Sequence, residues 1–139
     1  MKPKRVIINT DGASSGNPGP AAIGVTIKDE QGSLIAVISQ YIGRTTNNQA
    51  EYRAVIAGLE NAIRLDAESI EVRSDSELIV RQINGRYRVK NTALKPLYQR
   101  VKHLQGQFTN FAITYVPREQ NTEADRLANE ALNHSRTTP

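Results

Sequence analysis

Hydrophobic positions follow a two-residue rhythm in the N-terminal part of the chain and a helical rhythm after it. Apolar residues alternate with polar ones, or form short runs, over residues 5–11, 21–28 and 34–42. These segments predict three strands, and the short, turn-rich connections between them favour antiparallel pairing. Over residues 47–65 the apolar residues recur at helical spacing instead, which predicts an amphipathic helix.

The remainder of the chain switches repeatedly between the two patterns. It predicts strands over residues 69–75 and 111–116, helices over 76–83, 94–104 and 123–133, and a loop over 117–122. Three meandering strands followed by strands that alternate with helices indicate an α/β fold, with one mixed sheet and helices against its faces. We expect a single domain over residues 1–134 and a flexible tail over 135–139.

Composition narrows the class of protein. The chain has no cysteine, which excludes a disulfide framework and a thiolate metal site. It has no apolar run long enough to span a bilayer, so we expect a cytoplasmic protein with no membrane partner.

The distribution of charge is uneven. Residues 78–118 contain eight Lys or Arg and no Asp or Glu, whereas the other residues hold 10 basic and 14 acidic side chains. This asymmetry is typical of a surface that meets phosphates, although a solvated helix face would give the same pattern.

Four carboxylates stand at unusual positions. Asp11 and Asp75 end predicted strands, where α/β sheets usually bind ligands, although each could simply begin a turn. Glu51 and Asp125 continue the apolar stripes of their predicted helices, although both also lie where a helix dipole favours negative charge. If the four converge, their mutual repulsion calls for a cation. An all-oxygen set without cysteine or a well-placed histidine suits Mg²⁺ or Mn²⁺.

Five short motifs surround these carboxylates. In chain order they are Thr10-Asp11-Gly12, Gly16-Asn17-Pro18-Gly19, Thr45-Thr46-Asn47-Asn48-Gln49-Ala50-Glu51, Ser74-Asp75-Ser76 and Glu123-Ala124-Asp125-Arg126-Leu127-Ala128. Together, and in this order over nearly the whole chain, they resemble type 1 ribonuclease H. The resemblance implies a ribonuclease H-like fold, in which a five-stranded mixed sheet of three antiparallel strands and then parallel ones is flanked by helices. It also implies an endonuclease that cuts the RNA strand of RNA–DNA hybrids with two Mg²⁺ ions, leaving 5′-phosphate and 3′-hydroxyl ends. We expect this protein to be a monomer.

The same resemblance implies roles for individual residues. Asp11 would bridge both metal ions, Glu51 and Asp75 would complete the site of one ion, and Asp125 would help to hold the other. The residues that resemble the family's substrate contacts, to the RNA minor groove or to a phosphate of the DNA strand, are Gly12, Asn17, Arg44, Thr46, Asn47, Asn48 and Asn91. Arg44, Thr46 and Asn91 could alternatively be ordinary loop and cap residues.

The chain departs from many members of the family in two places. The loop before Asp125 lacks their histidine, so Arg118 or Glu119 is the candidate for product release or a phosphate contact. Residues 84–91 replace a long Trp-containing protrusion with a short basic segment, which predicts weak and salt-dependent binding. Cleavage of double-stranded RNA stays open at this point. The alternative function is a hybrid-binding module without catalysis, which would not need all four acids.

Overall fold

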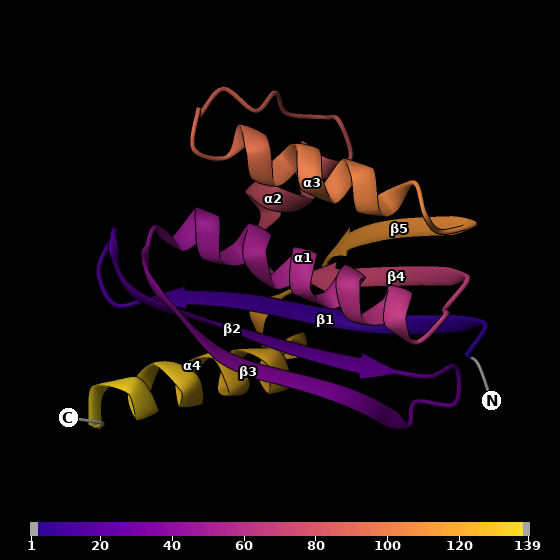
Figure 1. Ribbon diagram of the computed structural model, residues 1–139, viewed down its shortest axis with the longest axis horizontal. Helices are drawn as coiled ribbons and strands as arrows, with labels where there is room; N and C mark the ends of the chain where they lie inside the picture. The colour runs from indigo at the N-terminus through magenta and orange to yellow at the C-terminus, as the bar shows by residue number, and fades with distance from the viewer. Residues whose placement is uncertain (1–2, 138–139) are drawn as a thin grey trace.

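The N-terminal strands form an antiparallel meander, as their alternation predicts. In the computed structural model, which describes residues 3–137, these strands are β1 (Arg5–Ser14), β2 (Gly19–Lys28) and β3 (Leu34–Thr45). Two further strands, β4 (Ser69–Ser74) and β5 (Asn110–Tyr115), add in parallel beyond β1. The resulting order, β3-β2-β1-β4-β5, confirms the predicted five-stranded mixed sheet and places β1 at its centre (Figure 1).

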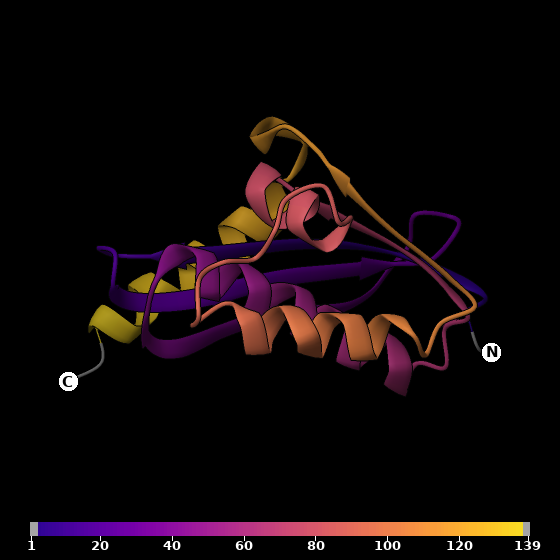
Figure 2. The same ribbon diagram turned by 90° about the horizontal axis from the view of Figure 1, so that it is seen from above.

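The helices cover both faces of this sheet. On one face, α1 (Asn47–Arg64) packs on β1 and β2, and α3 (Lys95–Gln105) packs against α1. The short α2 (Glu77–Ile83) lies near β5 and α3. On the other face, α4 (Thr122–Thr137) crosses β1, β2 and β3, as the view from above shows (Figure 2).

Several predicted boundaries differ from the structure by two or more residues, including the start of β2 at Gly19 and the end of β3 at Thr45. Two others concern β1 and the C-terminal tail. Asp11 does not end its strand, because β1 continues to Ser14 and pairs with the first residues of β2 (Ser14 with Ala21). The last helix does not stop at Asn133 but continues to Thr137, so the first part of the predicted tail is helical. Residues 138–139 of that tail lie outside the described residues. The loop before α4 also contains a single 3₁₀ turn, η1 (Arg118–Gln120).

The main hydrophobic core lies between the sheet and α1. Val6, Ile8 and Val25 from the sheet meet Val55 and Leu59 from α1, and all five are almost completely buried. On the opposite face α4 approaches the sheet very closely. A Cβ atom on Gly24 would lie 2.0 Å from the carbonyl oxygen of Ala124, so only glycine allows this spacing. Within residues 3–137, no helix is both long enough and apolar enough to cross a membrane.

Candidate active site

Sheet topology brings two of the four carboxylates together. Strands β1 and β4 are parallel neighbours, and Thr10 on β1 is in register with Ser74 on β4. Asp11 and Asp75 follow these two residues directly, so both carboxylates lie at the same end of the strand pair. The parallel crossover through α1 therefore makes neighbours of residues that are far apart in sequence.

Glu51 reaches the same point from α1. A capping box between Thr46 and Gln49 fixes the start of this helix. The helix then passes so close to β1 that a Cβ atom on Gly12 would lie 2.4 Å from the backbone nitrogen of Glu51. The Gly12 N–H donates a hydrogen bond to the Glu51 carboxylate. Glu51 is 5% exposed, which agrees with its predicted place on the apolar stripe.

Asp125 approaches from the opposite face of the sheet, on the first turns of α4. Its carboxylate accepts hydrogen bonds from Arg118, at 3.5 Å, and from the side-chain amide of Asn129, at 3.2 Å. It is less buried than Glu51, with 28% of its side chain exposed. Asp125 therefore faces an open cavity and not the protein interior that its stripe position predicts.

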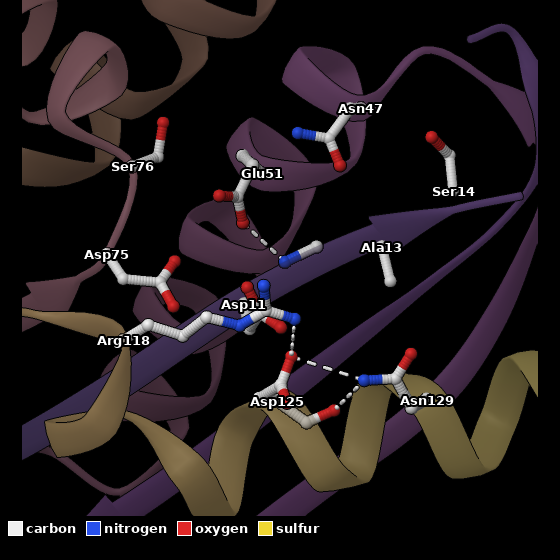
Figure 3. A pocket seen from close by; sticks show the side chains of 11 residues that line it. Asp11, Ala13, Ser14, Asn47, Glu51, Asp75, Ser76, Arg118, Asp125 and Asn129 are labelled. Atoms are coloured by element: carbon white, nitrogen blue, oxygen red, sulfur yellow. Dashed lines mark hydrogen bonds and ion pairs between the residues drawn. The ribbon is translucent and has the colours of Figure 1, made fainter. Parts of the chain in front are cut away.

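The four carboxylates line one cavity of about 420 Å³. Figure 3 shows them pointing towards a common centre, with the guanidinium group of Arg118 beside Asp125. The lining residues are Asp11, Gly12, Ala13, Ser14, Asn47, Glu51, Asp75, Ser76, Arg118, Asp125 and Asn129. The structure therefore brings together all four acids that the sequence singles out.

Crowding and burial shift the protonation of these groups. Burial raises the pKa of Asp11 to about 9, and the negative charges of Glu51 and Asp75 add to the effect. Burial also raises the pKa of Glu51 to about 8, although the hydrogen bond from Gly12 opposes the shift. The pKa of Asp75 is raised as well, again mainly by burial. Without a cation, the cluster holds protons that isolated carboxyl groups lose.

The donor set fits a divalent metal ion. Asp11, Glu51 and Asp75 each offer a carboxylate oxygen, and these oxygens lie within 4.8 Å of one another. Oxygen-only ligands with several negative charges are what hard cations such as Mg²⁺ and Mn²⁺ prefer. A bound cation would also offset the cost of burying these charges and their mutual repulsion, which together raise their pKa values.

The predicted substrate contacts separate into two groups. Gly12 and Asn47 line the cavity, and the side chain of Asn17 accepts a hydrogen bond from the backbone N–H of Asn47 at 3.0 Å. The other predicted contacts, which are not among the residues that line it, are Arg44, Thr46, Asn48 and Asn91.

Two residues of the second group have a local structural role. The Thr46 hydroxyl caps α1 by accepting a hydrogen bond from Gln49 at 3.2 Å. The Asn91 side chain accepts from the N–H of Ala93 at 2.8 Å, which fixes the turn before α3. Asn91 is therefore a loop residue that stabilises a turn, and Leu94, not Asn91, is the N-cap of α3.

The two candidates for the place of the missing histidine differ in position. Arg118 lines the cavity and contacts Asp125, whereas Glu119 is exposed and does not belong to the lining. Both histidines of the chain, His103 and His134, are exposed and also outside the lining.

Sequence reasoning missed two asparagines beside the carboxylates. Asn129 stands one helical turn after Asp125 and donates to both its backbone carbonyl and its side chain. Asn121 stands one turn before Asp125 and is 2% exposed. The spacing of four residues after Asp125 was a usable signal for Asn129, because residues at that spacing share a helix face. Asn121 precedes the helix, so the same rule does not identify it.

Comparison with known proteins agrees with this geometry. A model of the reverse transcriptase-like family matches residues 9–131. The bifunctional protein Rv2228c of Mycobacterium tuberculosis is 46% identical over 129 residues, which cover 92% of this chain and 35% of that protein. This chain therefore spans about a third of the length of that relative.

Two solved structures are similar over almost their whole length. RNase H1 from the archaeon Halobacterium salinarum is 45% identical, with a TM-score of 0.91 over 94% of this chain and 98% of that one. LC11-RNase H1 from compost, solved in complex with an RNA/DNA hybrid, is 44% identical, with a TM-score of 0.89 over 95% of this chain and 99% of that one. With the family match and the conserved arrangement of the sheet, these likenesses show that the chain belongs to the type 1 ribonuclease H family.

Proposed function

We propose that this protein is a ribonuclease H, an endonuclease that hydrolyses the RNA strand of RNA–DNA hybrids with divalent metal ions and leaves 5′-phosphate and 3′-hydroxyl ends. The observation that carries the proposal is the convergence of four carboxylates in one open cavity. Support for the substrate comes from LC11-RNase H1, whose solved complex contains an RNA/DNA hybrid.

In this proposal the carboxylates divide between two ions. Asp11, Glu51 and Asp75, whose oxygens lie within 4.8 Å of one another, hold one Mg²⁺ or Mn²⁺ ion. Asp125, which lines the same cavity, holds the second ion together with Asp11. The chemistry that a pair of such ions supplies is the activation of water and the stabilisation of the leaving oxygen.

The other residues of the cavity position the hybrid. Asn47 has a side-chain amide that both donates and accepts hydrogen bonds, as a contact to a ribose 2′-hydroxyl requires. Arg118, with 77% of its side chain exposed, is placed to contact a phosphate next to Asp125. Gly12, Asn17, Arg44, Thr46, Asn48 and Asn91 complete the proposed substrate contacts, and Glu119 is a second candidate for product release.

The basic segment of residues 84–91 extends this binding surface. It forms the connection between α2 and α3, which lies at the same end of the molecule as the N-terminus of α1 (Figures 1 and 2). Arg86, Tyr87, Arg88 and Lys95 line a second, open hollow there. The segment contains Arg86, Arg88 and Lys90 but no Asp or Glu, so its net charge is positive. This charge attracts the phosphate backbone without reading base sequence.

A strand-labelled cleavage assay tests the function. The parent protein, with Mg²⁺ or Mn²⁺, is incubated with RNA–DNA hybrid, double-stranded RNA and double-stranded DNA, and the ends of the products are identified. We expect the RNA strand of the hybrid to be cut, and the second substrate decides whether double-stranded RNA is also accepted.

The matched variants are Asp11→Asn in the cavity and Glu30→Gln, an exposed acid outside it. Asp11→Asn should lower the rate about 100-fold or more, because it removes several kcal/mol of metal-based stabilisation. Glu30→Gln should cleave like the parent. A parent protein that retains hybrid without cutting it would favour the non-catalytic binding module instead.

The state and location of the enzyme are part of the proposal. We propose a monomer, since the cavity contains all four carboxylates within one chain. We also propose a cytoplasmic enzyme, in keeping with a chain that has no cysteine. Sedimentation at micromolar concentration tests the first statement, and fractionation of the cells tests the second.

A further inference from the structure

One buried polar side chain lies behind the carboxylate cluster without lining the cavity. Asn121 stands between η1 and α4 and is 2% exposed. A buried amide is costly unless its donors and acceptor are all used. The partners of this side chain therefore show what it holds in place.

The side chain of Asn121 lies beside two of the catalytic segments. It donates a hydrogen bond to the backbone carbonyl of Thr10 at 2.9 Å, directly before Asp11 on β1. The Asn121 side chain also lies beside the carboxylate of Asp75, where it lowers the pKa of that group against the larger effect of burial. Because a backbone carbonyl only accepts, the contact to Thr10 requires the NH₂ end of the amide.

The oxygen end of the same amide is fixed from the other side. It accepts a hydrogen bond from the side-chain nitrogen of Asn9 at 2.9 Å. Asn9 thereby sets the orientation in which the Asn121 NH₂ group faces Thr10.

The backbone of Asn121 contacts the segment that carries Asp125. Its carbonyl accepts a hydrogen bond from the N–H of Asp125 at 3.1 Å, in the first turn of α4. One residue therefore hydrogen-bonds to the strand that carries Asp11 and to the helical turn that carries Asp125, and lies beside the carboxylate of Asp75.

We infer that Asn121 is a positioning residue of the metal site, which sets the spacing of Asp11, Asp75 and Asp125 without touching substrate. The inference rests on the proposed function, because it assigns these acids to metal ions. Hydrogen-bond partners of metal ligands typically change metal affinity or activity by about 10- to 100-fold when they are removed.

Asn84 provides a matched control. Its side chain also donates to a backbone carbonyl, that of Ile113 at 3.1 Å, and so ties the end of α2 to β5. It contacts no carboxylate of the cavity. Asn121→Ala removes a buried amide and Asn84→Ala an exposed one. Each variant loses a side-chain hydrogen bond to a backbone carbonyl, but only Asn121→Ala loses contacts to the catalytic segments.

The experiment measures Mn²⁺ binding to parent, Asn121→Ala and Asn84→Ala by titration calorimetry without substrate. Cleavage of hybrid is then measured against Mg²⁺ concentration. We expect Asn121→Ala to bind Mn²⁺ about tenfold more weakly or worse. Its rate should recover in part at high Mg²⁺, with a KM for hybrid close to that of the parent. Asn84→Ala should stay within about threefold of the parent in Mn²⁺ affinity.

Mn²⁺ affinity of Asn121→Ala within threefold of the parent would overturn the inference. If Asn121→Ala does not fold, Asn9→Ala decides, because it removes only the contact that orients the Asn121 amide. A loss of Mn²⁺ affinity of threefold or more supports the inference, and unchanged affinity overturns it. A parent that binds Mn²⁺ but leaves hybrid intact would contradict the proposed function alone, because the binding measurement does not depend on cleavage.

Discussion

Replacing Gly12 by alanine tests whether the close approach of α1 to β1 places Glu51. The new Cβ atom would lie 2.4 Å from the carbonyl carbon of Ala50 and from the nitrogen of Glu51, both backbone atoms. Ordinary contact begins at 3.4 Å, so the start of α1 must retreat by about 1 Å. A misplacement of this size costs about 100-fold in rate, and overpacking costs about 1–3 kcal/mol of stability.

The assay compares Gly12→Ala with Gly106→Ala by hybrid cleavage and by urea unfolding. Gly106 ends α3 with a φ of −65°, and a Cβ atom there would meet its nearest neighbour at 3.5 Å, so alanine fits. We expect Gly106→Ala to keep the parent's activity and to be as stable or slightly more stable. If Gly12→Ala cleaved hybrid within threefold of the parent, the reasoning that links the helix–strand contact to the position of Glu51 would be refuted.

Three further outcomes are expected. In the metal-free protein the raised pKa values of Asp11, about 9, and Glu51, about 8, mean that the folded state keeps protons that the unfolded chain loses above about pH 4. The parent's free energy of unfolding, relative to that of Asp11→Asn, should therefore fall as the pH rises from 5 to 8, and Mg²⁺ should reverse this fall. If, with a metal chelator present, the difference between the two proteins stayed constant over this pH range, the expectation would be wrong. Arg118→Ala should lower the salt slope of hybrid binding by about one, as loss of one phosphate contact requires, whereas an unchanged slope would remove Arg118 from the substrate surface. Gly24→Ala should push back α4, because its Cβ atom would lie 2.0 Å from a backbone oxygen of that helix. The variant should lose about 1–3 kcal/mol of stability in urea unfolding and much of the cleavage activity that depends on Asp125. Stability and activity equal to those of the parent would show that the helix can adjust without cost.

The sequence predicted the elements well where one physical rule dominates. Ile23, Val25 and Ile27 alternate with smaller residues along β2 and predicted the strand, although α1 and α4 bury both of its faces. The helical spacing of apolar residues predicted α1 in the same way. Glu51 was identified as an acid on a buried stripe because helix geometry alone fixes that face. These features depend on residues close together in sequence.

Features that depend on distant residues were not predictable in the same way. The continuation of β1 to Ser14 depends on pairing with β2, while Gly12 and the residues after it resemble a turn locally. Asp125 lies on a stripe that predicts burial, yet the cavity at the end of the sheet leaves it partly exposed. Asn121 resembles an ordinary loop residue until β1 and β4 are placed beside it.

The docking of α4 on the sheet has a consequence for how activity appears during synthesis. Segments carrying Asp11, Glu51 and Asp75 leave the ribosome first, but Asp125 follows only after β5. A nascent chain that has already formed β1, α1 and β4 therefore still lacks one of the four carboxylates. Since contacts between residues so distant in sequence form slowly, the recovery of cleavage during refolding should coincide with the last folding phase. The proposed nuclease activity therefore requires the complete fold.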